Sequence, residues 1–298
     1  MFKRLNRLES PNAKQITPNA KRQTINHKPQ TIIHMKWLTI FFISWILMCA
    51  TTHQYKGDFC GITNTSFKNG ETVKMTVYYS TLGAYIGAGD ATFTTTLERF
   101  NGKPVYHAVG VGNTYPFFDN FFKVRDRYES YIDTNTLLPI KFIRNVDEGG
   151  FKIYNNVTFN QTTNTAVSTN GVFKITDCMQ DVVSAMYYAR NINFDKLKKG
   201  DKIPFDMFLD DEVHHLYLRY MGKEKIKTQY GKFRAIKFKP LLIKGTMFKG
   251  GEGMTAWVSD DPNHLLLRVE SPIVVVSIKV DMMGYKNLRY PLSSLMGL

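Results

Sequence analysis

Catalytic signatures are absent from this 298-residue sequence. No serine lies in a Gly-x-Ser-x-Gly elbow, and the glycine-rich tract 244–253 lacks the Gly-Lys-Ser/Thr ending that holds a nucleotide phosphate. Long apolar runs are also absent, because the uncharged run 37–50 is shorter than the roughly 20 residues that a membrane-spanning helix needs. These absences argue against the usual serine-hydrolase, P-loop and helical membrane-protein classes.

Cysteine is scarce, and three residues in the whole chain do not make a disulfide framework. Cys49 lies in the apolar run, and the Ile-Leu-Met before it lacks the small residue that lipoprotein processing normally requires. Cys60 and Cys178 remain for the folded part of the chain. They can form a disulfide in an oxidising compartment, and two buried thiols are the alternative, because sequence spacing does not fix the distance between two Cα atoms.

The positive charge is unevenly distributed. The chain carries a formal net charge of +14, but residues 1–36 contain eight Lys or Arg and a single acid, which leaves +7 for the rest. In the body of the chain, basic residues alternate with aromatic and acidic residues, as in 123–129. This alternation is typical of a solvated sheet face, so nucleic acid is not an expected partner.

The N-terminal region has the features of an export signal. Residues 1–34 are polar, contain three prolines and show no apolar periodicity, which indicates a disordered tail or an over-extended gene model that precedes a true start at Met35. Residues 35–50 have a basic start, an apolar centre and a small-residue end, as in a signal peptide. A short buried core helix is the competing interpretation. We expect an exported protein in the periplasm or at the outer-membrane periphery of a Gram-negative bacterium, with membrane contact only through this signal segment.

The remainder, residues 60–298, reads as one all-β domain. Short β-branched and aromatic runs are separated by turn residues, at spacings that leave no room for helical crossovers. The pattern predicts an antiparallel meander that closes into a barrel-like or sandwich domain, with one mid-chain helix at about 178–190 capped by Asp177. The expected strands are 71–80, 89–99, 103–112, 120–132, 139–148, 150–160, 164–174, 202–210, 213–221, 224–230, 232–243, 254–260, 263–271 and 273–282.

Several tracts resemble a known family. They include Cys60-Gly-Ile-Thr-Asn-Thr-Ser-Phe67, the run from Phe122 to Asp133, the run from Gln180 to Arg190, and Trp257-Val-Ser-Asp-Asp261. The chain resembles the Bacteroidetes exported proteins of the domain-of-unknown-function 3108 family over nearly everything after Cys60. The resemblance implies an all-β, barrel-like fold similar to that of YmcC and a location in the cell envelope. No catalytic residues are established for this family, so the resemblance assigns none to this chain.

One strand face is a candidate for ligand binding. Arg125, Arg127 and Tyr131 share a side of the strand 120–132 with Lys123 and Glu129, because alternate residues of a strand point the same way. If this face lines the barrel interior or its mouth, the two arginines can bind an anionic group bidentately. If it faces water, it forms ordinary cross-strand ion pairs with Asp147 or Glu148.

A cluster of acids and histidines is the candidate for catalysis or metal binding: Asp206, Asp210, Asp211, Glu212, His214 and His215. Adjacent residues of a strand point to opposite faces, so His214 and His215 cannot both bind one ion. The acids lie at an expected turn, where Asp is favoured for its local hydrogen bonding. The sequence therefore predicts an acidic hairpin, with neither a metal nor another cofactor.

Two functions fit these observations. The favoured one is a non-catalytic protein of the cell envelope that binds or scaffolds a lipid, a glycan or a partner protein. The alternative is an envelope hydrolase with an unrecognised site around Asp210, Asp211, His214 or His215. An apolar cavity supports the first function, whereas carboxylates and a histidine that converge in a cleft support the second.

Overall fold

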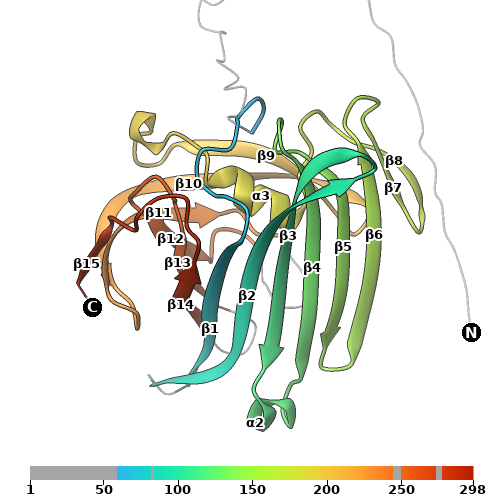
Figure 1. Cartoon of the computed structure of the whole chain (residues 1–298). Helices are drawn as coiled ribbons and strands as arrows, with labels where there is room; N and C mark the ends of the chain where they lie inside the picture. Colours follow the sequence, from blue (N-terminus) through green and yellow to red (C-terminus); the bar gives the residue numbers. More distant parts are fainter. Residues whose placement is uncertain (1–58, 82–83, 244–249, 273–276, 298) are drawn as a thin grey trace, which may run out of the picture. The chain divides into compact units, whose positions relative to one another are not determined.

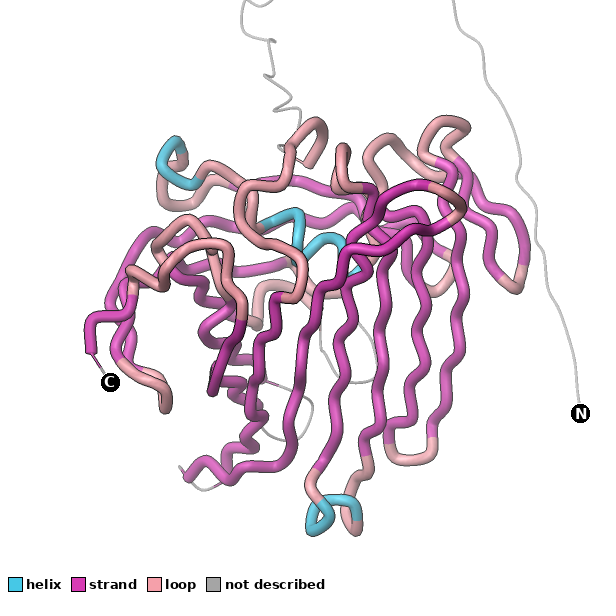
Figure 2. Tube along the Cα trace, viewed as in Figure 1, coloured by secondary structure: helices cyan, strands magenta, loops and turns pink. Residues whose placement is uncertain are grey.

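The computed structural model describes residues 59–81, 84–243, 250–272 and 277–297 (Figure 1). The expected tail and signal peptide, residues 1–50, lie outside the described residues. In the part that is described, no helix is long and apolar enough to cross a membrane. Figure 2 shows that strands dominate and that helices are few and short.

The strands form two consecutive series with α3 (Val182–Ala189) between them. The first series is β1 (Glu71–Thr81), β2 (Ala84–Phe100), β3 (Lys103–Thr114), β4 (Val124–Asp133), β5 (Pro139–Glu148), β6 (Phe151–Asn160), β7 (Thr165–Ser168) and β8 (Gly171–Lys174). The second series is β9 (Lys202–Leu209), β10 (Glu212–Lys227), β11 (Lys232–Pro240), β12 (Thr255–Ser259), β13 (Leu266–Pro272), β14 (Ser277–Lys286) and β15 (Leu295–Gly297).

All these strands belong to one antiparallel sheet. Its order is β8-β7-β6-β5-β4-β3-β2-β1-β14-β13-β12-β11-β10-β9, with β15 paired to β11. Each series is therefore a meander, and the two meet where β1 pairs with β14. The edges of the sheet are β8 in the first series and β9 in the second. The predicted all-β antiparallel meander is confirmed. The described strands do not close the barrel, because no ladder joins β8 to β9.

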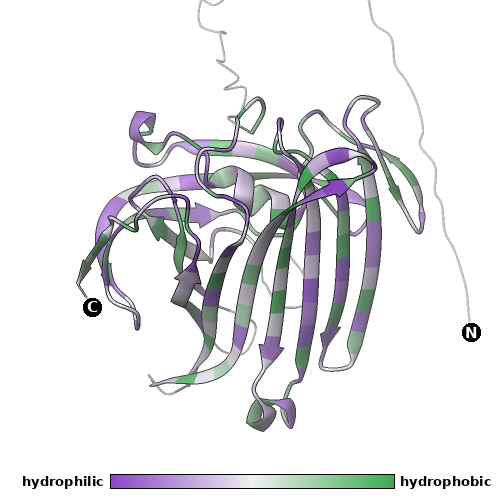
Figure 3. Cartoon of the chain, viewed as in Figure 1, coloured by the Kyte–Doolittle hydropathy of each residue, from purple (hydrophilic) through white to green (hydrophobic). Residues whose placement is uncertain are grey.

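Strand alternation sends one set of side chains inward and the other outward, and Figure 3 shows the resulting bands of apolar and polar residues. Buried side chains form two apolar clusters. One surrounds α3 and includes Phe67, Phe142 and Phe208; the other lies among β1, β11, β12, β13 and β14 and includes Met75 and Phe233. The core is therefore divided between two regions of the curved sheet.

The predicted helix begins later than expected. Its N-cap is Asp181, not Asp177, because the Asp181 carboxylate accepts hydrogen bonds from the amides of Val183 and Ser184 at 2.8 Å each. The Ser184 hydroxyl accepts in return from the Asp181 amide, which completes a capping box. Cys178 cannot belong to a right-handed helix, since its φ is +56°.

Three predictions about the strands are also wrong, and one of them is 164–174, which the structure divides into β7 and β8. Residues 213–221 and 224–230 were expected as separate strands, but β10 continues through Gly222, whose φ of +97° accommodates a register shift against β11. The expected strand 120–132 begins only at Val124, because the chain first makes the short helix α2 (Pro116–Asp119). Proline is suited to that helix start, since its fixed φ matches the helix.

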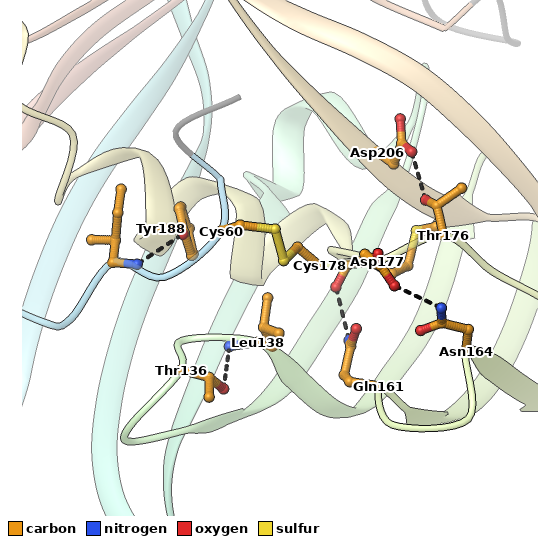
Figure 4. Close-up of a disulfide and its surroundings, with 12 residues drawn as sticks. Cys60, Thr136, Leu138, Gln161, Asn164, Thr176, Asp177, Cys178, Tyr188 and Asp206 are labelled. Atoms are coloured by element: carbon orange, nitrogen blue, oxygen red, sulfur yellow. Dashed lines mark hydrogen bonds between the residues drawn. A yellow bond between two sulfur atoms is a disulfide. The ribbon is translucent and has the colours of Figure 1, made fainter. Parts of the chain in front are cut away.

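A disulfide joins Cys60 to Cys178, with Cα atoms 5.6 Å apart (Figure 4). It attaches the segment before β1 to the loop that leads into α3. The Tyr188 hydroxyl accepts a hydrogen bond from the Ile62 amide at 3.2 Å, and the Asn164 amide donates to Asp177 at 2.7 Å. The loop around the disulfide is thus tied both to the N-terminal segment and to the first series of strands.

Candidate functional site

The predicted ligand-binding face of β4 is engaged with its neighbours. Arg125 donates to the Asp119 carboxylate at 2.6 and 3.0 Å, and Arg127 donates to Glu129 at 2.7 Å. The Tyr131 ring stacks on His107 with centroids 4.2 Å apart. These contacts raise the pKa of both arginines, chiefly through the hydrogen bonds to Asp119 and Glu129. A binding role for Arg125, Arg127 and Tyr131 stays a prediction.

The predicted acid and histidine cluster is dispersed. His215 Nδ1 lies 2.7 Å from Asp206, whereas His214 is on the opposite face with its Nε2 3.2 Å from the Leu209 carbonyl. Asp211 accepts from Asn170 at 2.5 Å, and Asp210 bonds to Arg144. Within the described ranges, no three His, Cys, Asp or Glu side chains are placed to hold a metal ion.

A cavity of about 750 Å³ lies between the two series of strands and α3. This volume is within the range of about 300–1,000 Å³ that is usual for small-molecule sites. Its walls are mainly apolar and come from both series of strands and from α3. Among the side chains that line it are Met75, Phe93, Val146, Ile153, Val182, Ala185, Phe205, Leu216, Ala256 and Val269.

Few ionisable side chains line the cavity, and they form two groups. One lies at the C-terminal end of α3 and comprises Arg190, Tyr187 and His264. The other lies on the facing β4–β5 wall and at the β9–β10 turn. Its members are Tyr128, Arg144, Glu148 and Asp210.

Arg190 is fully engaged by the protein. Its two Nη atoms donate to the two carboxylate oxygens of Glu71 at 2.5 and 3.0 Å, and its Nε donates to the Asn263 carbonyl at 3.0 Å. Glu71 is 1% exposed, so this pair is buried. Nδ1 of His264 lies 2.6 Å from the Arg190 carbonyl, and burial lowers the pKa of that imidazole. This group holds the C-terminal end of α3 against the start of β1 and the loop between β12 and β13.

Arg144 is engaged only in part, although its side chain is 7% exposed. Nε and Nη2 both donate to Asn155 Oδ1, at 2.9 and 2.5 Å, and Nη2 also reaches Asp210. No described residue accepts a hydrogen bond from Nη1. Asp210 itself is 60% exposed and lies in a turn, so its neutralisation of Arg144 is weakened by solvent.

Tyr128 stands directly across from Arg144 in the β4–β5 register and also lines the cavity. Burial, with a contribution from Asp126, raises the pKa of the phenol to about 12, so it is a hydrogen-bond donor at any physiological pH. Its hydroxyl has no hydrogen-bond partner in the described part of the chain. Two donors therefore face the cavity side by side.

Two carboxyl groups lie beyond this pair on the same strands. Glu148 lines the cavity, and burial together with the charge of Glu148 raises the pKa of Asp126 to about 7. The Asp126 and Glu148 carboxyls thus repel one another, and near neutral pH Asp126 is part-protonated. Asp126 and Val146 form the next inward-facing row after the donor pair, and Glu148 lies in the row after that.

A family model described as "Protein of unknown function (DUF3108)" matches residues 74–283. The chain belongs to the DUF3108 family. No curated protein sequence matches this DUF3108 chain.

Solved structures resemble this DUF3108 chain in fold. A β-barrel-like protein of the domain of unknown function DUF1849 from Brucella abortus is 7% identical, with a TM-score of 0.51 over 74% of this chain and 99% of that one. This likeness shows a barrel-like fold. A protein described as exported, with a YmcC-like fold, from Bacteroides fragilis is 10% identical, with a TM-score of 0.31 over 76% of this chain and 99% of that one.

The sequence contained a signal for Arg144 that our sequence interpretation did not use. Phe142, Arg144 and Val146 alternate along β5, and all three point inward. A charged residue between two apolar ones of the same parity indicates a buried charge. The contribution of Asp210 could not be found in this way, because it comes from a turn 66 positions away.

Proposed function

We propose that this protein is exported to the cell envelope of a Gram-negative bacterium and there binds a lipid, without catalysis, in the cavity between its two series of strands. The observation that carries the proposal is the cavity of about 750 Å³ with mainly apolar walls. The signal-like segment 35–50 supports export. The disulfide between Cys60 and Cys178 agrees with an oxidising compartment.

The lining favours a lipid over a glycan or a protein segment. Glycans and peptides carry many hydrogen-bonding groups, and each one that enters an apolar cavity without a partner loses about 1–3 kcal/mol. The described lining offers two free donors, Arg144 and Tyr128. An alkyl chain instead gains about 0.8 kcal/mol for each buried methylene. A mostly hydrocarbon ligand therefore fits this cavity best.

The hydrolase alternative has weaker support. His215 and Asp206 are the one histidine–carboxylate contact of the proposed cluster, and the His215 side chain is 76% exposed. The remaining acids bond to Arg144 and Asn170 instead of to a histidine. Of the whole cluster, only Asp210 lines the cavity among the described residues.

The test begins with protein purified from its own envelope, analysed by native mass spectrometry and lipid extraction. We expect a co-purifying lipid, and we expect saturated fatty acids of increasing length to bind more tightly by up to about fourfold per methylene until the cavity is full. Ala256 on β12 lines the cavity, so Ala256→Phe should reduce binding by at least tenfold. Thr255→Phe is the matched control, because Thr255 is the preceding residue and points to the other face of the strand. Equal binding by both variants would contradict the proposal.

A further inference from the structure

We propose that Arg144 and Tyr128 hold the acidic head group of the cavity's ligand, which is therefore an amphiphile with one carboxylate or phosphate on an apolar tail. The inference rests on the proposed function and adds the chemical class of the ligand. It follows from the incomplete hydrogen bonding of one buried charge.

Arg144 is a buried charge. A guanidinium that is 7% exposed has lost most of its hydration, and a buried charge is stable only when it is paired and hydrogen-bonded. The described partners of Arg144 are a neutral amide, Asn155, and a carboxylate, Asp210, that is itself largely in water. The Nη1 donor has no acceptor among the residues described. An anion in the cavity would supply what is missing.

Arg190 lines the same cavity but differs from Arg144 in its hydrogen bonding. Arg190 binds a buried carboxylate through both Nη atoms, and its Nε is also used. It therefore has little left to offer a ligand. Of the two arginines that line the cavity among the described residues, Arg190 has acceptors for Nε and both Nη atoms, whereas Arg144 does not.

The two donors are aligned with one another. Tyr128 and Arg144 are cross-strand partners on the inward face, so their side chains start about 5 Å apart and run in the same direction. A phenol and a guanidinium placed in this way can donate to the two oxygens of one carboxylate or phosphate. Glu148 and Asp126, farther along the two strands, repel an anion and so confine it to the Arg144 row.

The geometry gives the ligand a direction. Its head lies at the β4–β5 wall, near the turn that carries Asp210, and its tail extends over the apolar surface toward α3 and the second series of strands. Asp210 is exposed and can yield to the incoming anion by moving toward water. A chain-free anion lacks the tail contacts and should bind weakly.

The probes are oleic acid, oleyl phosphate and oleyl alcohol, each below its aggregation concentration, with acetate and inorganic phosphate as chain-free anions. We expect wild-type protein to bind one or both acidic amphiphiles about tenfold or more tightly than the alcohol. Which acid binds better distinguishes a carboxylate ligand from a phosphate ligand. Arg144→Gln should reduce this preference to about twofold or less, and Tyr128→Phe should reduce it in part.

Arg99→Gln is the control, because Arg99 is an exposed arginine at the β2–β3 hairpin and donates a hydrogen bond to the Gly102 carbonyl. It should keep the full preference. Equal binding of acid and alcohol by wild-type protein would overturn the inference and leave lipid binding standing. Binding of none of the three long-chain probes would overturn the proposed function itself. The wild-type comparison decides the matter even if Arg144→Gln fails to fold.

Discussion

Removal of the disulfide should destabilise the protein by about 2–5 kcal/mol. The perturbation is the double substitution of Cys60→Ser and Cys178→Ser. The two cysteines are 118 residues apart, and the loss of loop-closure entropy for a loop of this length corresponds to about 5 kcal/mol in the chain-entropy model. Measured losses for native disulfides are commonly about 2–5 kcal/mol. Since a domain has a total stability of about 5–15 kcal/mol, the effect is large.

The assay is urea unfolding at equilibrium, followed by tryptophan fluorescence and far-ultraviolet circular dichroism. We expect a lower midpoint with an almost unchanged slope for the double variant, and a similar shift when the wild type is reduced with dithiothreitol. Reductant should not shift the double variant, which controls for side effects of the reagent. A loss below about 1 kcal/mol would refute the reasoning, because it would mean that the bridge does not constrain the unfolded chain.

Two further predictions concern buried charges. Burial raises the pKa of Asp181 to about 6 from an ordinary 3.8, so the folded protein binds a proton there more tightly than the unfolded chain does. The contribution of this proton to the free energy of unfolding is fully present below about pH 4. It is lost, by up to about 3 kcal/mol, as the pH rises through 6. Asp181→Asn keeps a good N-cap and should flatten this slope in urea unfolding between pH 4 and pH 8; an unchanged slope would contradict the assignment. Glu71→Gln leaves the buried Arg190 without its carboxylate partner and should lower the free energy of unfolding by about 3–5 kcal/mol. Lys152→Gln removes one member of an exposed ion pair and should change the free energy of unfolding by less than about 1 kcal/mol. Similar losses for these two variants would show that the buried pair has no special weight.

The sequence predicted the sheet because both of its determinants are local. Alternating apolar and polar residues mark the strands, and turns such as Asn101-Gly102 and Asn170-Gly171 mark the hairpins. The pairing of β1 with β14 joins segments about 200 residues apart, and no local pattern encodes it. The helix start was misplaced because Asp177 and Asp181 are both good caps, and only the latter is placed to cap the helix by the fold around it.

The candidate site was less accessible to sequence reasoning. The most conspicuous charges, Arg125 and Arg127, pair with acids close to them in sequence, Asp119 and Glu129. Arg144 is less conspicuous in the sequence, because it is a single charge between the inward-facing apolar residues Phe142 and Val146. Its significance depends on which acceptors reach it from β6 and from the β9–β10 turn, and that is a property of the tertiary structure.

The number of strands bears on the cavity, although the described strands do not close into a barrel. About eight strands enclose a space that side chains can fill, and longer closed sheets leave a lumen. Here fourteen strands follow one continuous path, α3 occupies part of the enclosed space, and about 750 Å³ remains. The two ends of that path, β8 and β9, are connected by the contact of Asn170 with Asp211 and by the backbone hydrogen bonds of Gln180 to β9. Arg144, farther in on β5, also contacts Asp210 in the β9–β10 turn. Since no described ladder of strand hydrogen bonds crosses this junction, separating the ends there breaks fewer backbone hydrogen bonds than separating any pair of long neighbouring strands.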